Sequence, residues 1–285
     1  MLPVRIRIDL SYDGSNFHGW AVQPGLRTVQ GEVQRALAMS LRREEVWVTC
    51  AGRTDTGVHA RGQVIHLDVE EAELVASAGR AQVPPVEALV RKLNGILDAD
   101  VRVHAARVVP EAFDARFSAL WRRYAYRVAD TPAAYDPLTR NHVLHWPRPL
   151  DLEAMNLAAA DLLGLNDYTS FCKAREGATS IRQVNRLGWA RDARGTATMT
   201  VLADAFCHSM VRALVGCLLA IGEGRRDVTW AGEMLARAER SSDIHIASAR
   251  GLTLEEVGYP SDDELAGRLL VTRARRGEHE VQGRD

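Results

Sequence analysis

The sequence predicts an α+β protein built from two mixed lobes. Some segments alternate apolar and polar residues as strands do, and others repeat apolar residues at helical spacing. Both kinds occur in each half of the 285-residue chain, which is long enough for two cores. We expect one lobe over residues 1–114, a second over 115–260, and a short helix with a mobile charged tail over 261–285.

The first lobe has the predicted order βαββαβ. Residues 4–12 alternate Val, Ile and Leu with polar residues, which is typical of a strand with one wet face. Residues 28–41 carry an apolar stripe at helical spacing behind Thr28, which has the chemistry of an N-cap. The remaining predicted elements are strands at 46–50, 63–69 and 100–109 and a helix at 84–97 with Pro in its opening turn. This order is the split ferredoxin-like arrangement, with helices on one face of the sheet.

A second set of elements begins near residue 115. A strand is predicted at 122–128, and a helix at 150–164 ends at Gly164. Further strands are predicted near 182–190, 196–204 and 252–259, and further helices near 207–222 and 229–240. We therefore expect two similar lobes with a cleft between them.

The composition is that of an ordinary globular protein, with 46% hydrophobic and 26% charged residues. No run approaches the roughly 20 apolar residues that span a bilayer, and no signal peptide opens the chain, so we expect a cytoplasmic protein. The four cysteines stand singly, which favours reduced thiols over a zinc site or disulfide framework. The net charge of −1 gives no global argument for a nucleic-acid partner, although nearly all cations are Arg.

The loop AGRTDTGVHARG, residues 51–62, is long for a connection between neighbouring strands, and long loops tend to be functional. Asp55 at its centre has two interpretations. It can cap a turn through its own backbone, as Thr-Asp-Thr-Gly composition favours. It can also serve as a nucleophile, because Arg53 and Arg61 would hold the carboxylate ionised.

Other chemistries fit the sequence less well. Asp55, His59 and His66 straddle a change from loop to strand, so we expect no metal site. Residues 14–20, GSNFHGW, have glycine spacing but lack the Lys-Ser/Thr of a phosphate loop. No GxSxG motif of a serine hydrolase is present. A carboxylate, arginines and aromatic residues remain as the candidate chemistry.

Two segments supply partners for Asp55. Strand alternation in RRYAYRV puts Tyr124 and Tyr126 on one face, where both can simply belong to the core. Arg212 lies within an apolar helix, where a cation is costly to bury unless it is paired. An anionic partner is expected for Arg212, either a structural acid or Asp55.

Several motifs in register resemble the TruA family of tRNA pseudouridine synthases, and the resemblance extends to about residue 260. They are AGRTDTGVHARGQVIHLDV (51–69), YDGSNFHGW (12–20), TVQGEVQRAL (28–37), FDARFSALWRRYAYRV (113–128), PLDLEAMNLAAADLLGLNDYTSF (149–171), FCHSMVRALVG (206–216) and GLTLEEVGY (251–259). The order of the motifs is that of the family.

The resemblance implies a role for five residues. Asp55 would be the nucleophile, Tyr124 would contact the target uracil, and Arg212 would pair with the catalytic Asp. Leu252 would line the base pocket, and Arg53 would hold displaced RNA through its phosphates. The family modifies tRNA positions 38 to 40 in the anticodon arm, works as a homodimer, and folds as two α+β lobes around a shared, largely antiparallel sheet with a basic cleft.

The implied reaction isomerises uridine to its C-glycoside without redox change, so no cofactor is expected. Three residues depart from the family pattern: Ala21, Trp121 and Ser248. Two other functions stay open at this point. A non-catalytic tRNA-binding or chaperone module would need no Asp55, and a glycosidase would need a second carboxylate, for which Asp114 or Asp167 are candidates.

Overall fold

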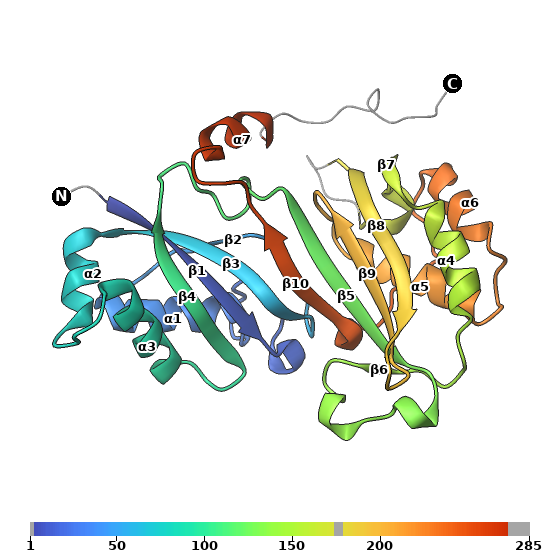
Figure 1. Ribbon diagram of the computed structural model, residues 1–285, viewed down its shortest axis with the longest axis horizontal. Helices are drawn as coiled ribbons and strands as arrows, with labels where there is room; N and C mark the ends of the chain where they lie inside the picture. The colour runs from blue at the N-terminus through green and yellow to red at the C-terminus, as the bar shows by residue number, and fades with distance from the viewer. Residues whose placement is uncertain (1–2, 174–178, 273–285) are drawn as a thin grey trace. The chain divides into compact units, whose positions relative to one another are not determined.

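A computed structural model describes residues 3–173 and 179–272 (Figure 1). The predicted α+β class is confirmed by a mixture of helices and largely antiparallel strands. The chain forms two compact units. One comprises the residues up to Leu120 together with the segment from Leu254 on, and the other comprises Trp121–Thr253. The expected short helix is α7 (Leu265–Thr272), and the charged tail after it lies outside the described residues.

The sheet of the first unit is centred on β1 (Pro3–Tyr12), which pairs antiparallel with β3 (His59–Glu70) and β4 (Val101–Val109). β2 (Thr49–Cys50) and β10 (Leu252–Gly258) both pair with β3. Apolar side chains of β1 at alternate positions are fully buried, while the residues between them are partly exposed. The alternation that predicted this strand therefore reflects a sheet with one covered face.

Three helices pack together against one face of this sheet (Figure 1). They are α1 (Val29–Leu41), α2 (Glu71–Ala78) and α3 (Pro85–Ile96). Thr28 caps α1 as predicted, since its hydroxyl accepts a hydrogen bond from Gly31 N. The order βαββαβ is confirmed, with α2 as an addition that begins in a capping box formed by Glu70 and Glu73.

The loop that carries Asp55 is shorter than the sequence predicts. β3 starts at His59, four residues before the predicted start, so the connection from β2 covers residues 51–58. β2 itself is only the last two residues of the strand predicted at 46–50. Pairing with β1 outweighs the polar composition of residues 59–62, and a bulge between Leu10 and Tyr12 absorbs the change of register.

The second unit has the strand order β5 (Trp121–Ala129), β9 (Ala197–Ala203), β8 (Ile181–Arg191) and β7 (Gly164–Asp167). The short β6 (Leu144–His145) runs parallel to β5. Its helices are α4 (Leu152–Ala160), α5 (Met210–Gly222) and α6 (Trp230–Arg237). Twelve of the thirteen residues of α5 are buried, so this helix forms the centre of the unit's core.

Two helix ends in this unit differ from the prediction. α4 ends at Ala160, and Gly164 opens β7 with a φ of 97°, a backbone conformation that favours glycine. α5 begins at Met210 because Ser209 before it adopts a left-handed conformation, with a φ of 63°. The 3₁₀ turns of the two units are η1 (Gly14–Asn16), η2 (Pro132–Ala134), η3 (Pro137–Thr139), η4 (Thr169–Phe171) and η5 (Ala249–Gly251).

The fold brings two of the four single cysteines together. Cys172 and Cys207 lie side by side with Cα atoms 5.7 Å apart, while Cys50 and Cys217 are free and buried. Single cysteines 35 positions apart give no signal of this proximity, because the fold of the second unit brings them together. Among the described residues, none of the helices has the length and apolar character that crossing a membrane requires.

Candidate active site

The five predicted site residues lie in two sets. Arg53 and Asp55 belong to the 51–58 loop of the first unit, where Arg53 is exposed and Asp55 is half-buried. Tyr124 on β5, Arg212 on α5 and Leu252 at the start of β10 belong to the second unit. Tyr124 and Leu252 are 8% and 5% exposed, and Arg212 is half-buried.

The loop around Asp55 is held by the segment that follows β1. Trp20 N donates to the carbonyl of Thr54 at 3.0 Å, and Gly57 N donates to the carbonyl of Phe17 at 3.3 Å. Within the loop, Val58 N donates to the carbonyl of Asp55 at 3.1 Å and closes a turn. The backbone on both sides of Asp55 is therefore fixed by hydrogen bonds.

Two glycines of the GSNFHGW segment permit this close approach. A Cβ on Gly14 would lie 2.0 Å from the carbonyl oxygen of Val58, and one on Gly19 would lie 2.9 Å from that of Thr54. Gly19 also has a φ of 88°. The glycine spacing that resembles a phosphate loop thus serves the contact of one backbone segment with another.

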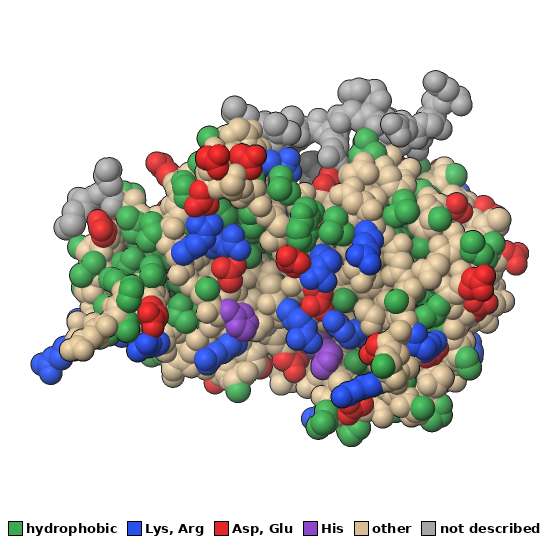
Figure 2. Space-filling view, in the orientation of Figure 1, with side chains coloured by type: hydrophobic (Ala, Val, Ile, Leu, Met, Phe, Trp, Pro, Cys, Tyr) green, Lys and Arg blue, Asp and Glu red, His purple; other side chains and the backbone are tan. Residues whose placement is uncertain are grey.

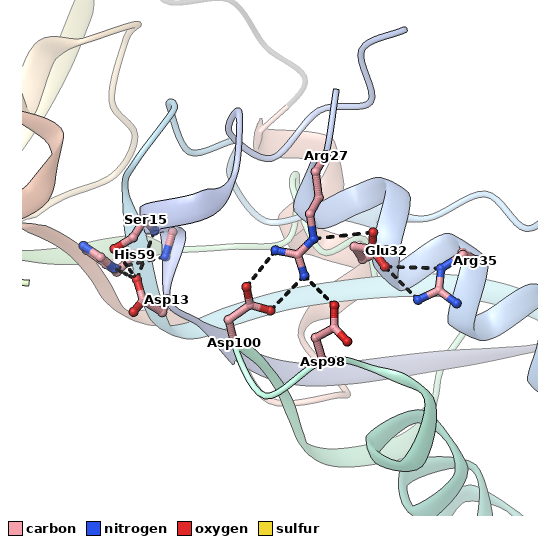
Figure 3. A network of polar contacts seen from close by, with 9 residues as sticks. Asp13, Ser15, Arg27, Glu32, Arg35, His59, Asp98 and Asp100 are labelled. Atoms are coloured by element: carbon pink, nitrogen blue, oxygen red, sulfur yellow. Dashed lines mark hydrogen bonds and ion pairs between the residues drawn. The ribbon is translucent and has the colours of Figure 1, made fainter. Parts of the chain in front are cut away.

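Arg27 anchors the far end of the same segment (Figure 3). Its guanidinium donates to Asp100 at 2.7 Å and to Asp98 at 2.9 Å, and it lies 3.7 Å from Glu32. The hydrogen bond to Asp100 raises the pKa of Arg27. The guanidinium also stacks over the ring of Phe17, 4.2 Å from its centroid. Arg27 therefore ties residues 13–28 to the start of β4.

The two histidines considered as metal ligands have structural contacts. His59 Nδ1 accepts from Gly14 N at 3.0 Å. It also lies 3.1 Å from the carboxylate of Asp13 (Figure 3). His66 Nδ1 accepts from Ala115 N at 3.0 Å, and burial lowers the pKa of His66. The Nδ1 atoms of His59 and His66 therefore each hold the backbone of another segment in the first unit.

In the second unit, Arg212 and Tyr126 hold the segment that leads to Leu252. Arg212 Nε donates to the carbonyl of Ala247 at 2.7 Å, and the hydroxyl of Tyr126 donates to that of Ser248 at 2.8 Å. Burial raises the pKa of Tyr126, so its hydroxyl remains a donor. Arg212 thus bonds a backbone carbonyl, and the anionic partner expected for it from the sequence stays a prediction.

The GL pair at residues 251–252 depends on close packing. A Cβ on Gly251 would lie 2.7 Å from the Tyr126 ring and 2.8 Å from the carbonyl of Arg127. Ser248, which departs from the family pattern, caps η5, with its hydroxyl accepting from Arg250 N at 3.3 Å. Leu252 is placed directly after this turn.

Tyr124 packs against Phe206 in an edge-to-face arrangement, with ring centroids 5.2 Å apart. On β9, Val201 lies opposite Tyr124 and Met199 lies opposite Tyr126, and all four residues are buried. Tyr124 and Tyr126 therefore share the covered face of the sheet. The alternation that predicted a shared face for the two tyrosines is confirmed.

Sequence reasoning missed residues that support the loop from below. Tyr12, Thr54 and Gln63 are buried and joined by side-chain hydrogen bonds. Tyr12 follows the apolar phase of β1, with Ile6, Ile8 and Leu10, so the pattern could have placed it inside. Gln63 begins the strand predicted at 63–69, but its burial had no signal in the sequence, because it depends on the bulge that shifts the register of β3 against β1.

Comparison with known proteins identifies the family. A family model described as tRNA pseudouridine synthase matches residues 158–260. A tRNA pseudouridine synthase A from Streptomyces griseus subsp. griseus is 53% identical over 95% of this chain and 93% of its own length. Proteins of the same name from Frankia casuarinae and Mycobacterium leprae are 52% and 48% identical, over 95% of this chain and 95% and 94% of theirs. The chain belongs to the tRNA pseudouridine synthase A family.

Family membership confirms the resemblance found in the sequence and the predicted enzyme class, an isomerase acting on tRNA. Among solved structures, a chain of the "Crystal Structure of a Cbf5-Nop10-Gar1 Complex" aligns with a TM-score of 0.32 and 12% identity. That alignment covers 89% of this chain and 59% of the other, and its score is too low to support an argument.

Proposed function

We propose that this member of the tRNA pseudouridine synthase A family converts uridine to pseudouridine at positions 38, 39 and 40 of the tRNA anticodon arm, with Asp55 as the nucleophile. The observation that carries the proposal is family membership combined with an intact GRTD motif, in which Asp55 is half-buried on a backbone fixed by hydrogen bonds. A carboxylate on a firmly held backbone suits covalent catalysis because the reacting atoms must stay aligned.

The reaction breaks the bond between N1 and C1′ of uridine, turns the base and forms a bond between C5 and C1′. N1 gains a proton and C5 loses one, so atoms and electrons balance without a cofactor. Asp55 can attack either the uracil ring or C1′ to form a covalent intermediate. Both routes need an ionised carboxylate and a group that accepts the proton from C5.

The other predicted residues supply the remaining roles. Arg212 would pair with Asp55 and keep it charged. Tyr124 would stack on the flipped uracil while its hydroxyl assists removal of the C5 proton. Leu252 would line the base pocket, and Arg53, which is exposed, would bind RNA phosphates.

Tritium release from tRNA labelled at uracil C5 tests this proposal directly. We expect release by the wild type and none above background by Asp55→Ala and Asp55→Asn at equal folded concentration. Full turnover by Asp55→Asn would remove Asp55 as the nucleophile. Binding of tRNA without release by the wild type would favour the non-catalytic tRNA-binding module.

The positions of modification need a separate test. Anticodon stem-loops that carry a single uridine at position 38, 39 or 40 should each be modified, and one with cytidines at all three should not. Product mapping by carbodiimide derivatisation and primer extension would show this. We further propose that the enzyme acts in the cytoplasm as a homodimer, which sedimentation equilibrium of the full chain would test.

A further inference from the structure

Three buried polar side chains connect the 51–58 loop to the strands beneath it. Tyr12, Thr54 and Gln63 are 4%, 7% and 0% exposed. The Tyr12 hydroxyl lies 2.7 Å from Thr54 Oγ1, and Gln63 Nε2 donates to the Tyr12 hydroxyl at 3.2 Å. They come from the end of β1, from the loop itself and from β3, so the network joins the loop to two strands of the sheet.

Gln63 also bonds the loop backbone. Its Nε2 donates to the carbonyl of Gly52 at 2.8 Å, and its Oε1 accepts from Val64 N at 3.2 Å. A carbonyl can only accept and an N–H can only donate, so these two partners fix the orientation of the amide. Both hydrogens of the amide are used, and the buried side chain has one defined position.

A bulge brings these side chains together. Leu10 is opposite Gln63 and Tyr12 is opposite Ala60, so β3 has one residue more than β1 over this stretch. Such bulges redirect side chains and are common beside active sites. A regular ladder would have placed Tyr12 opposite Arg61 instead.

Apolar side chains would fill this space at lower cost, because each buried polar group must recover the hydrogen bonds it loses with water. A satisfied buried network does contribute something an apolar core lacks, which is a single defined geometry. Here that geometry is transmitted to the backbone carbonyl of Gly52 and to the side chain of Thr54, the residues on either side of Arg53. Asp55 follows Thr54 directly.

We infer that Tyr12 and Gln63 are positioning residues for Asp55. Through Thr54 and Gly52 they hold the GRTD backbone so that the carboxylate is aligned with the bound uridine before the reaction begins. The inference rests on the proposed nucleophilic role of Asp55. It assigns no contact with RNA to either residue, since both act from inside the first unit.

The test uses Tyr12→Phe, which removes only the hydroxyl, and Gln63→Met, which keeps the length of the side chain. We expect kcat for pseudouridine formation to fall about 10- to 100-fold in both, because small misplacements of a reacting group have effects of this order. The KM for tRNA should stay within about two-fold, since RNA contacts are unchanged.

Tyr168→Phe is the matched control. Tyr168 is 0% exposed, and its hydroxyl donates to the carbonyl of Leu162 at 2.7 Å in the second unit. This variant loses an equally buried hydrogen bond and should keep the wild-type kcat. If Tyr12→Phe retains kcat within two-fold of Tyr168→Phe, the positioning role is overturned.

Amide hydrogen exchange of the free protein provides a readout that does not need activity. Exchange at residues 52–58 should accelerate at least ten-fold in Tyr12→Phe and not in Tyr168→Phe. If the wild type releases no tritium but this difference is seen, the proposed function fails and the structural role of the network stands. If exchange and kcat are both unchanged in Tyr12→Phe, the inference fails while the proposed function stands.

Discussion

Tyr124 combines an aromatic ring and a hydroxyl whose contributions can be separated. The ring packs edge-to-face on Phe206 and is mostly buried, so Phe at position 124 preserves the packing. If the hydroxyl assists removal of the C5 proton, Tyr124→Phe should lower kcat by about 10²- to 10⁴-fold with little change in KM. Single-turnover tritium release would measure this. Normal release would leave the ring contact as the role of Tyr124.

Gly19 and Gly25 allow a test of the close approach between residues 12–20 and the loop. Both have a positive φ, 88° and 72°, but only Gly19 has backbone atoms within 3.4 Å of the position a Cβ would take. Gly25→Ala should cost about 1 kcal/mol of unfolding free energy from backbone strain. Gly19→Ala should cost more and should also lower kcat, because Thr54 and Asp55 must move.

Urea unfolding and tritium release on both variants would measure these effects. Equal losses of stability in the two, with kcat unchanged in Gly19→Ala, would mean that the glycine is required only for its backbone conformation. The contact with Thr54 would then have no part in holding the loop.

At the scale of elements, Asp130 joins three parts of the second unit. It directly follows β5, its carboxylate accepts two hydrogen bonds from Arg191 of β8 at 2.6 and 2.8 Å, and it accepts one from Leu150 N before α4 at 2.9 Å. Its side chain is 0% exposed and that of Arg191 is 34% exposed. Asp130→Asn should therefore lower the unfolding free energy by about 3 kcal/mol, the lower end for a broken buried pair.

The matched control is Glu87→Gln on α3, which breaks an exposed ion pair with Arg91 whose side chains are 49% and 64% exposed. That change should cost about 0.5 kcal/mol or less. Equal effects of the two substitutions in urea unfolding would contradict the structural importance of Asp130.

The pH dependence of this pair follows from its geometry. Burial acts to raise the pKa of Asp130, but the hydrogen bonds from Arg191 and Leu150 outweigh it and the pKa is lowered. The stabilisation is complete above the unfolded-state pKa of about 4 and is lost as the pH falls through the lower folded-state value. The stability difference between wild type and Asp130→Asn should shrink accordingly below pH 4, as urea unfolding at several pH values would show.

The elements with strong periodicity could be predicted from the sequence, and their ends and contacts could not. The alternation over residues 4–12 and the stripe over 28–41 fixed β1 and α1 because local pattern and burial agree there. β3 was predicted to start four residues late, at Gln63, since pairing with β1 and not composition includes residues 59–62 in the strand. The motifs indicated Asp55, but the network beneath it depends on the bulge and is visible only in three dimensions.

At the scale of the whole molecule, charge is nearly balanced, because the sequence has 36 Lys and Arg residues and 37 Asp and Glu residues. Attraction for RNA must therefore come from local clusters of cations rather than from net charge. In Figure 2, which has the orientation of Figure 1, Lys and Arg side chains gather over the strands, with acidic side chains among them. The uncovered faces of the sheets are the surfaces where this clustering is seen.

One such cluster crosses the sheet of the second unit. Arg123 of β5 is opposite Leu202 of β9, which is opposite Arg186 of β8, so both arginines lie on the face away from the buried Tyr124. If this row binds tRNA phosphates, Arg123→Met and Arg186→Met should each reduce the slope of log K against log salt concentration by about 0.7–0.9. Arg91→Met, on a helix of the first unit, is the control and should leave the slope unchanged. Filter binding of tRNA at several salt concentrations measures all three, and identical slopes would mean that RNA does not use this face.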